Sequence, residues 1–134
     1  MQKLFFILAL SILSIGMSNA KSLYSCFLSQ DVDMETFEVS NQITNNSLID
    51  ITLDGNTLRL GNQKTYSLFN RQVSNNGFVQ TVHYDAIDGQ NQRCKIKFIT
   101  DSSADWATRN IIMIWYNELS SKAKWYFSRD PQER

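Results

Sequence analysis

Alternation of apolar and polar residues with a period of two is the dominant pattern along the chain. Residues 48–53 (LIDITL) place Ile49, Ile51 and Leu53 on one side of an extended backbone. Residues 93–99 (RCKIKFI) alternate in the same way, with an apolar side and a side of three basic residues. Such alternation is typical of an antiparallel strand that covers a core with one face and meets water with the other.

Turn residues separate these runs from others of the same size. The sequence Asp54-Gly55-Asn56 stands between residues 48–53 and a second alternating run at residues 57–60, which predicts a hairpin. Further strands are expected at residues 23–28, 36–40, 65–69, 78–84, 110–116 and 123–128, with turns at 61–62, 74–77, 88–89 and 117–121. Strand-sized runs without a long helical period predict an all-β fold, a small antiparallel barrel or sandwich of about 7–8 strands.

Residues 101–109 (DSSADWATR) are the one stretch that favours a helix. Asp101 or a following serine can cap it, and its alanines and Trp106 tolerate helical geometry. We expect at most one short helix there, because residues 110–116 (NIIMIWY) are rich in β-branched and aromatic residues that favour a strand. The tail, residues 129–134, is polar and holds the only proline, so we expect it to be frayed.

The N-terminal residues have the order of a secretory signal peptide. Lys3 supplies a positive start, residues 4–15 carry no charge, and small residues precede a cut after Ala20. An uncleaved membrane anchor is the alternative, but an apolar run of about 12 residues is shorter than the roughly 20 that span a bilayer. We therefore expect a signal peptide at residues 1–20. Residues 21–134 then form a single exported domain, periplasmic or secreted, with no stable membrane anchor.

The exported part is close to neutral. The chain has 13 basic and 13 acidic residues, and the signal peptide takes one of the basic ones, Lys3. Near-neutral charge argues against nucleic acid as a partner, because such binding needs a strong basic excess. The charges are unevenly spread, since no Lys or Arg lies between Lys21 and Arg59, while residues 93–129 are mainly basic. We expect both regions to be solvated faces.

Two cysteines, Cys26 and Cys94, remain after removal of the signal peptide. In an exported chain an even pair favours one disulfide. Two free thiols or a metal site are the alternatives, but a single histidine and the lack of a Cys-x-x-Cys motif make a metal site the poorer one. The sequence therefore predicts a disulfide between Cys26 and Cys94.

Residues that could carry catalysis or hold a metal form no complete motif. His83 is the only histidine, and no Gly-x-Ser-x-Gly motif accompanies it and Asp85, so we expect a surface or rim histidine. Residues 31–35 begin like a calcium loop, but Thr36 stands where the loop needs Gly and Gln42 where it needs Glu. We expect no metal, no cofactor and no catalytic residue, and an enzyme is the less favoured class.

The C-terminal aromatic residues suggest a binding surface. Residues 110–116 are apolar on both faces, and Trp125 and Tyr126 repeat this pattern in the next predicted strand. A strand in so small a domain rarely finds cover on both faces from its own chain, so either the short predicted helix covers one face or that face meets a partner. Tryptophan and tyrosine are enriched at binding hot spots. The candidate partner-binding residues are Trp106, Trp115, Trp125 and Tyr126.

Three features resemble the bacterial inhibitors of c-type lysozyme, namely residues 23–26 (LYSC), the hairpin at residues 54–60 (DGNTLRL) and the late Cys94. Members of that family are exported antiparallel barrels with an early and a late cysteine, so the resemblance implies a barrel. The family's Ser-Gly-x-x-Tyr loop is missing, since residues 74–78 read SNNGF, and the chain runs 40 residues past Cys94. The resemblance covers about half of the exported part and none of the residues that act on lysozyme, so it assigns no family.

Three hypotheses about function follow. The first is a non-enzymatic exported binding protein, a periplasmic inhibitor or immunity-type protein that acts on another protein. The second is a small-ligand carrier that uses the interior of a barrel. The third is a hydrolase that uses paired carboxylates, whose separation depends on the fold.

Overall fold

The structure, a computed structural model, describes residues 21–133, and most of them lie in antiparallel strands. The prediction of an all-β fold with at most one short helix at residues 101–109 is confirmed. The elements of the described part are β1 (Lys21–Asp33), β2 (Val39–Asp54), β3 (Thr57–Leu60), β4 (Lys64–Asn76), β5 (Val79–Asp88), β6 (Arg93–Asp101), α2 (Trp106–Arg109), β7 (Asn110–Trp115), β8 (Lys122–Ser128) and β9 (Gln132–Glu133).

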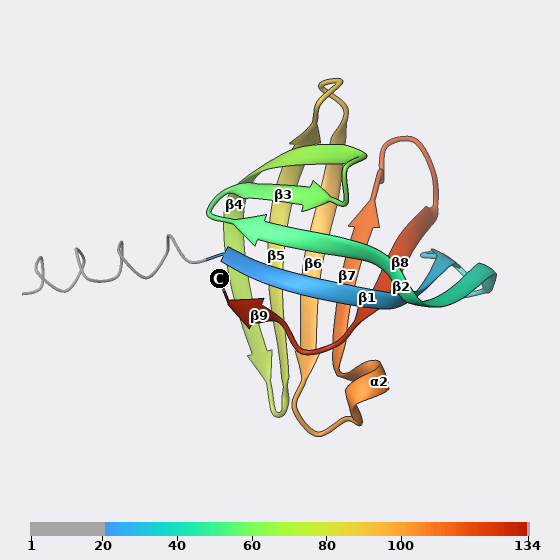
Figure 1. Cartoon of the computed structure of the whole chain (residues 1–134). Coiled ribbons are helices and arrows are strands. Elements are labelled where there is room, and N and C mark those ends of the chain that lie inside the picture. Colours follow the sequence, from blue (N-terminus) through green and yellow to red (C-terminus); the bar gives the residue numbers. More distant parts are fainter. Residues whose placement is uncertain (1–20, 134) are drawn as a thin grey trace, which may run out of the picture.

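A single sheet forms a barrel. Its strands follow the order β2-β3-β4-β5-β6-β7-β8-β1-β9, and pairing of β1 with β2 closes it (Figure 1). From β1 to β8 each strand lies beside the next one in sequence, because short turns can join antiparallel neighbours. The strand β1 also pairs with β8 and with β9. The closure makes the architecture a barrel rather than a sandwich of two sheets.

Alternating apolar residues of these strands fill the barrel. Ile51, Leu58, Ile96 and Ile112 are each 0% exposed and belong to one cluster of buried side chains. Burying a side chain of this kind contributes about 1.5–3 kcal/mol, so this interior is the main source of stability. All five tyrosines of the chain belong to the cluster or pack against it: Tyr24, Tyr66, Tyr84, Tyr116 and Tyr126.

Because β3 has only 4 residues, it pairs with only part of β2 and part of β4. It pairs with β2 only at residues 51–54 and with β4 only at residues 64–67. The remaining lengths of β2 and β4 therefore have one neighbouring strand each, β1 and β5. Gly61, in the turn that follows β3, has φ 57°, and a Cβ there would lie 3.1 Å from Cγ1 of Ile49, so the turn needs glycine.

Two local predictions were wrong. Residues 36–38 are not part of a strand, because Asp33 caps a turn through bonds from the backbone N–H groups of Glu35 (2.9 Å) and Thr36 (3.2 Å), and β2 begins only at Val39. The tail is not simply frayed, because Gln132 and Glu133 pair with Leu23 and Ser22 of β1. Both differences come from contacts between segments that local sequence patterns do not report.

The predicted disulfide is absent, and this corrects the sequence analysis. Cys26 and Cys94 are free thiols, 1% and 2% exposed. They belong to β1 and β6, which β7 and β8 separate in the sheet, and Cys26 pairs with Ile49 and Ser128 whereas Cys94 pairs with Ala86. Each cysteine is a small apolar residue of the interior, a role that free cysteine commonly has.

The predicted signal peptide, residues 1–20, lies outside the described residues. Within residues 21–133, no helix is both long enough and apolar enough to span a membrane.

Candidate functional site

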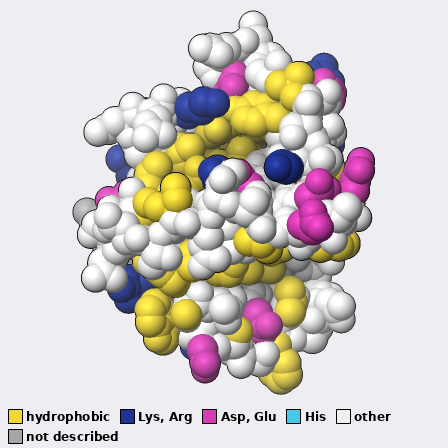
Figure 2. All heavy atoms as spheres, turned by 90° about the vertical axis from the view of Figure 1, so that its right-hand side faces the viewer, with side chains coloured by type: hydrophobic (Ala, Val, Ile, Leu, Met, Phe, Trp, Pro, Cys, Tyr) yellow, Lys and Arg dark blue, Asp and Glu magenta, His cyan; other side chains and the backbone are white. Residues whose placement is uncertain are grey.

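The outer wall of β7 and β8 carries the predicted aromatic residues. Ile112 and Ile114 of β7 and Tyr126 of β8 belong to or pack against the interior cluster, so their neighbours along each strand face outward. The register pairs outward-facing Met113 with Trp125 and Ile111 with Phe127. We call the outward-facing set the tryptophan face; its members are Trp106, Ile111, Trp115, Trp125 and Phe127. Apolar side chains reach the surface in several places on the side of β8 and α2, with Lys and Arg side chains among them (Figure 2).

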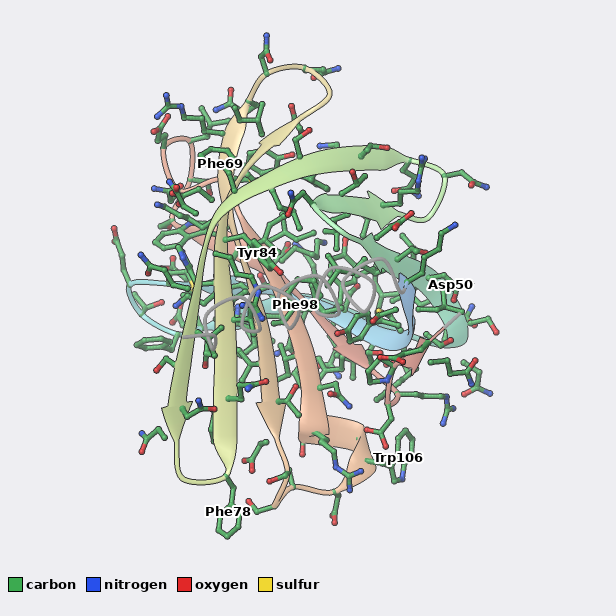
Figure 3. The ribbon with its side chains drawn as sticks, turned by 90° about the vertical axis from the view of Figure 1, so that its left-hand side faces the viewer. Asp50, Phe69, Phe78, Tyr84, Phe98 and Trp106 are labelled. Atoms are coloured by element: carbon green, nitrogen blue, oxygen red, sulfur yellow. The ribbon has the colours of Figure 1, made fainter. Side chains whose placement is uncertain are left out.

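Trp106 is the most exposed member of this face, at 52%. It begins α2, a helix of four residues with none buried, and its ring lies 5.1 Å from the ring of Phe27. The guanidinium of Arg129 lies over both rings, 4.9 Å from Trp106 and 5.6 Å from Phe27. Trp106 projects from one end of the barrel, as does Phe78, whereas Tyr84 and Phe98 belong to the interior (Figure 3). Trp106 is thus an exposed aromatic residue whose ring is held in place by Phe27 and Arg129.

Trp115 and Trp125 are half-buried and partly structural. The Trp115 indole N–H donates to the carbonyl of Ser120 at 2.8 Å and so ties the β7–β8 connection to the wall. Met113 beside them is only 1% exposed although it faces away from the interior. The buried Trp125 Nε1 has no hydrogen-bond partner in the described part of the chain. A buried donor without a partner costs about 1–3 kcal/mol, so this side chain is held there by packing.

The helix α2 covers at most part of the tryptophan face. With one turn it can contact only the ends of β6, β7 and β8 that lie nearest to it. A strand that is apolar on both faces is explained either by a covering helix or by contact with a partner. A helix from residues 101–109 therefore explains at most one end of this wall. Trp115 and Trp125 lie on the outer side of this wall, Trp106 lies at the end of the wall where α2 precedes β7, and Tyr126 lies on the inner side.

A basic row borders the tryptophan face. Arg93, Lys95 and Lys97 alternate along β6 with buried interior residues, and the register places Lys95 beside Trp115 and Lys97 beside Met113. Lys95 forms a 2.7 Å salt bridge with Asp85, whereas Arg93 and Lys97 have no acidic partner within 4 Å among residues 21–133. The row therefore keeps positive charge free beside the aromatic residues.

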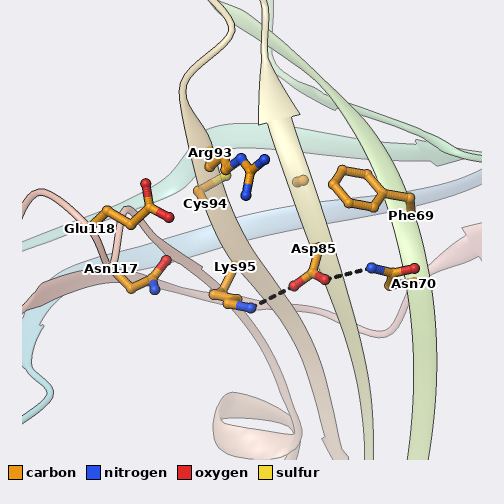
Figure 4. Close-up of a pocket in the computed structure, with 9 residues that line it drawn as sticks. Phe69, Asn70, Asp85, Arg93, Cys94, Lys95, Asn117 and Glu118 are labelled. Carbon is orange, nitrogen blue, oxygen red and sulfur yellow. Dashed lines mark hydrogen bonds and ion pairs between the residues drawn. The ribbon is translucent and has the colours of Figure 1, made fainter.

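Asp85 and Lys95 also line a small pocket of about 180 Å³ near the start of β6 (Figure 4). The Asp85 carboxylate accepts hydrogen bonds from Lys95 (2.7 Å) and from the Asn70 amide (2.9 Å), and these two bonds hold its pKa below the usual value. His83, two residues earlier, therefore has no hydrogen bond to Asp85, and burial lowers the pKa of its imidazole. The pair forms no catalytic relay.

A second pocket, of about 430 Å³, opens at the other end of the barrel from Trp106. Leu60 and Ile114 contribute apolar surface, and the rings of Tyr66, Tyr116 and Tyr126 form much of its wall. The polar residues around it come from three different segments of the chain: Asp31, Gln63, Lys64, Lys122 and Lys124. Sequence reasoning missed this site, because no local pattern shows that these segments meet.

A hydrogen-bonded cluster lies beside this pocket. The Tyr116 hydroxyl donates to Asp88 at 2.7 Å and accepts from the Lys64 ammonium at 3.1 Å. The Tyr66 hydroxyl is 3.3 Å from the Tyr116 hydroxyl. Burial, with the bonds to Tyr66 and Asp88, raises the pKa of Tyr116 far above its usual value, so it stays a neutral donor. This arrangement positions Lys64 but provides no activated nucleophile.

Two acidic residues of the β1–β2 hairpin, Asp31 and Asp33, are occupied by protein contacts. Asp31 binds the Lys124 ammonium at 2.9 Å and the Asn41 amide at 2.7 Å, and Asp33 caps the turn. Residues 21–133 contain no group of three or more His, Cys, Asp or Glu side chains placed to hold a metal ion.

Comparison of the chain with protein-family models, with curated proteins and with solved structures gave no match. The function is therefore argued from the geometry of the barrel and its surfaces.

Proposed function

We propose that the protein acts after export as a non-enzymatic binding domain, an inhibitor or immunity-type protein whose partner is another protein with an acidic, partly apolar surface. The observation that carries this proposal is that Trp115 and Trp125 lie on the outer wall formed by β7 and β8, beside a row of basic residues, with the exposed Trp106 at one end of that wall. Tryptophan and arginine are the residues most enriched at binding hot spots.

The composition and rigidity of this surface suit a partner protein. Trp106 is fixed by Phe27 and Arg129, so binding would cost little side-chain entropy. The free charges of Arg93 and Lys97 would attract an acidic surface and orient it during encounter. An acidic partner with an apolar centre therefore complements the tryptophan face better than a basic one.

A carrier that uses the barrel interior has less support. Interior residues such as Ile51, Leu58 and Ile96 fill the middle of the barrel with side chains that are 0% exposed. Barrels of about eight strands can either be filled in this way or hold one small ligand. The space that remains lies at the mouth of the barrel, so it is a surface pocket and not an interior cavity.

The test compares variants of the exported domain, residues 21–134, in capture from the envelope fraction of the host. Trp106→Ala and Lys97→Glu should each weaken capture of the same acidic protein. Loss of a central aromatic anchor costs about 2 kcal/mol or more, close to thirtyfold in affinity. Quantitative mass spectrometry of the bound fraction measures the loss.

Val73→Ala is the control, because Val73 is an apolar residue 43% exposed on β4, four strands away from β8 around the barrel. It should leave capture unchanged. Capture that is equally strong for all three variants, or that falls equally for Val73→Ala, contradicts the proposal. A partner with a strongly basic surface would contradict its electrostatic part.

A further inference from the structure

The pocket of about 430 Å³ at the barrel mouth has the features of a ligand site and is distinct from the tryptophan face. Its volume falls in the range of roughly 300–1,000 Å³ that is usual for small-molecule sites. Lys64 begins β4, Tyr116 follows β7 and Lys122 begins β8, whereas Trp106 precedes β7. Because β7 runs from the Trp106 end towards the pocket, the two sites lie at opposite ends of the barrel.

The pocket offers hydrogen-bond donors more than acceptors. The ammonium groups of Lys64, Lys122 and Lys124 border it, against one lining carboxylate, that of Asp31. That carboxylate is already bound by Lys124 and by Asn41. A ligand rich in acceptor oxygens complements such a wall, because lysine has three donors and no acceptor.

The balance of charge favours one negative charge on the ligand. Three ammonium groups face two carboxylates, because Asp88 lies 4.0 Å from Lys64 in addition to the Asp31–Lys124 pair. Lys122 also borders a neighbouring hollow with Asp33 and Glu38, but within residues 21–133 no salt bridge of 4 Å or less reaches its ammonium. Lys122 is thus the lining ammonium group without a salt bridge in the described part of the chain, and the nearby Asp33 and Glu38 partly offset its charge, so the pocket suits a single carboxylate better than a doubly charged phosphate.

The rest of the pocket favours an apolar body on the ligand. Leu60, Ile114 and the rings of three tyrosines make up much of its lining. The Tyr126 hydroxyl faces this region and has no hydrogen-bond partner in the described structure, while burial raises its pKa to about 12. It is therefore a neutral group that can donate to a ligand oxygen or accept from one.

We propose that this pocket binds a small organic monocarboxylate with an apolar body, with the carboxylate near Lys122 and Lys124 and the body against Leu60, Ile114 and Tyr126. The Tyr116–Asp88 bond holds Lys64 at the rim, so that the site is formed before the ligand arrives. This function is separate from protein binding by the tryptophan face and goes beyond it.

Isothermal titration of residues 21–134 with three matched probes tests the proposal. 4-Phenylbutyrate has the carboxylate and the apolar body, 4-phenylbutan-1-ol has only the body, and inorganic phosphate has only the charge. We expect phenylbutyrate to bind with a Kd of about 1 mM or lower and the other two at least tenfold more weakly. Absence of phenylbutyrate binding, or equal binding of the alcohol, overturns the proposal.

Substitutions in the pocket test whether phenylbutyrate binds there. Lys122→Met keeps the length of the side chain without its charge, and Tyr126→Phe removes only a hydroxyl; each should weaken phenylbutyrate binding about tenfold or more. Lys97→Met is the matched control on the outer wall and should leave the Kd unchanged. An unchanged Kd in both pocket variants, or an equal loss in Lys97→Met, overturns the assignment. Since Lys97 belongs to the basic row beside the tryptophan face and not to the pocket, failure of either site is seen separately.

The carboxylate could belong to a free small molecule or to the end of a peptide chain. A tetrapeptide that ends in phenylalanine, compared as free acid and as amide, distinguishes these sources. Tighter binding of the free peptide than of phenylbutyrate supports a chain terminus, and weaker binding supports a free acid. Binding of the amide as tightly as the acid contradicts recognition of a carboxylate.

Discussion

Asp88 is a charged residue whose side chain is only 5% exposed, and its surroundings explain how the barrel tolerates it. Its Oδ1 accepts from the backbone N–H groups of Gln90 (2.8 Å) and Gln92 (3.0 Å), and its Oδ2 accepts from Tyr116 (2.7 Å). Burial alone would raise the pKa of Asp88, but these bonds and the nearby Lys64 outweigh it and lower the pKa. The carboxylate is stable there because it is fully bonded as an anion.

Substitution Asp88→Asn should therefore lower stability in a way that depends on pH. A carboxylate with a lowered folded-state pKa stabilises the fold above its unfolded pKa of about 3.9, and this contribution is lost as pH falls through the folded value. At pH 7 we expect a loss of about 2 kcal/mol relative to the native chain, and the two should converge as the pH falls below 3.9. Urea unfolding at several pH values measures both effects.

Asp105→Asn serves as the control, because Asp105 is exposed and makes no side-chain capping bond at α2. It should change stability little at any pH. A difference between Asp88→Asn and the native chain that stays constant down to pH 2 would show that ionisation of Asp88 plays no part.

Free thiols in the interior predict a distinct alkylation pattern. Burial raises the pKa of both Cys26 and Cys94 to about 12, so almost no thiolate exists at pH 8. We expect iodoacetamide to leave the folded domain unmodified and to add two groups after unfolding in guanidinium without a reductant. Intact mass spectrometry reads the result, and a domain that needs reductant before it accepts two groups would restore the disulfide.

Among the elements, the β1–β2 hairpin has the most unusual turn. Phe37 has φ 64° although it is not a glycine, and its side chain is 68% exposed. Its N–H donates to the carbonyl of Asp33 at 2.6 Å, which holds this conformation. A left-handed conformation costs a residue with a side chain about 1–2 kcal/mol, so the tip of the hairpin stores strain.

Comparison of Phe37→Gly with Phe37→Ala tests this strain. Both remove the phenyl ring, but only glycine adopts a positive φ without steric cost, so Phe37→Gly should be more stable by about 1 kcal/mol. This reverses the order usual in regular strands, where alanine is the more stable of the two. Urea unfolding measures the difference, and an alanine variant as stable as the glycine variant would mean that the turn relaxes.

For the molecule as a whole, the fold was easier to predict from sequence than the sites. The alternation in residues 48–53 and 93–99 correctly placed Ile51, Cys94, Ile96 and Phe98 in the core, because a half-buried strand imposes a period of two on its own sequence. The pocket was not predictable, since Lys64, Tyr116 and Lys122 meet only through strand order and register. The disulfide prediction failed for the same reason, because counting cysteines says nothing of which strands adjoin.

The closed sheet should make unfolding a single event. Every strand from β1 to β8 pairs with at least two other strands, so none can leave without opening the barrel. We expect far-ultraviolet circular dichroism, which follows the strands, and tryptophan fluorescence, which follows the outer wall, to give coincident thermal transitions. An earlier transition in fluorescence would show that the wall around Trp115 and Trp125 loosens before the barrel opens.

Pairing of the first strand with the eighth has a consequence for how the chain reaches this structure. Cys26 of β1 lies beside Ser128 of β8, more than a hundred positions later. An N-terminus that emerges first can pair with β2 early, but its other edge has no neighbour until almost the whole chain has arrived. Contacts of such long range slow folding, typically to milliseconds or seconds in β proteins. Until then the partly formed sheet exposes an unpaired strand edge, and a chaperone that covers this edge would have its greatest effect in that interval.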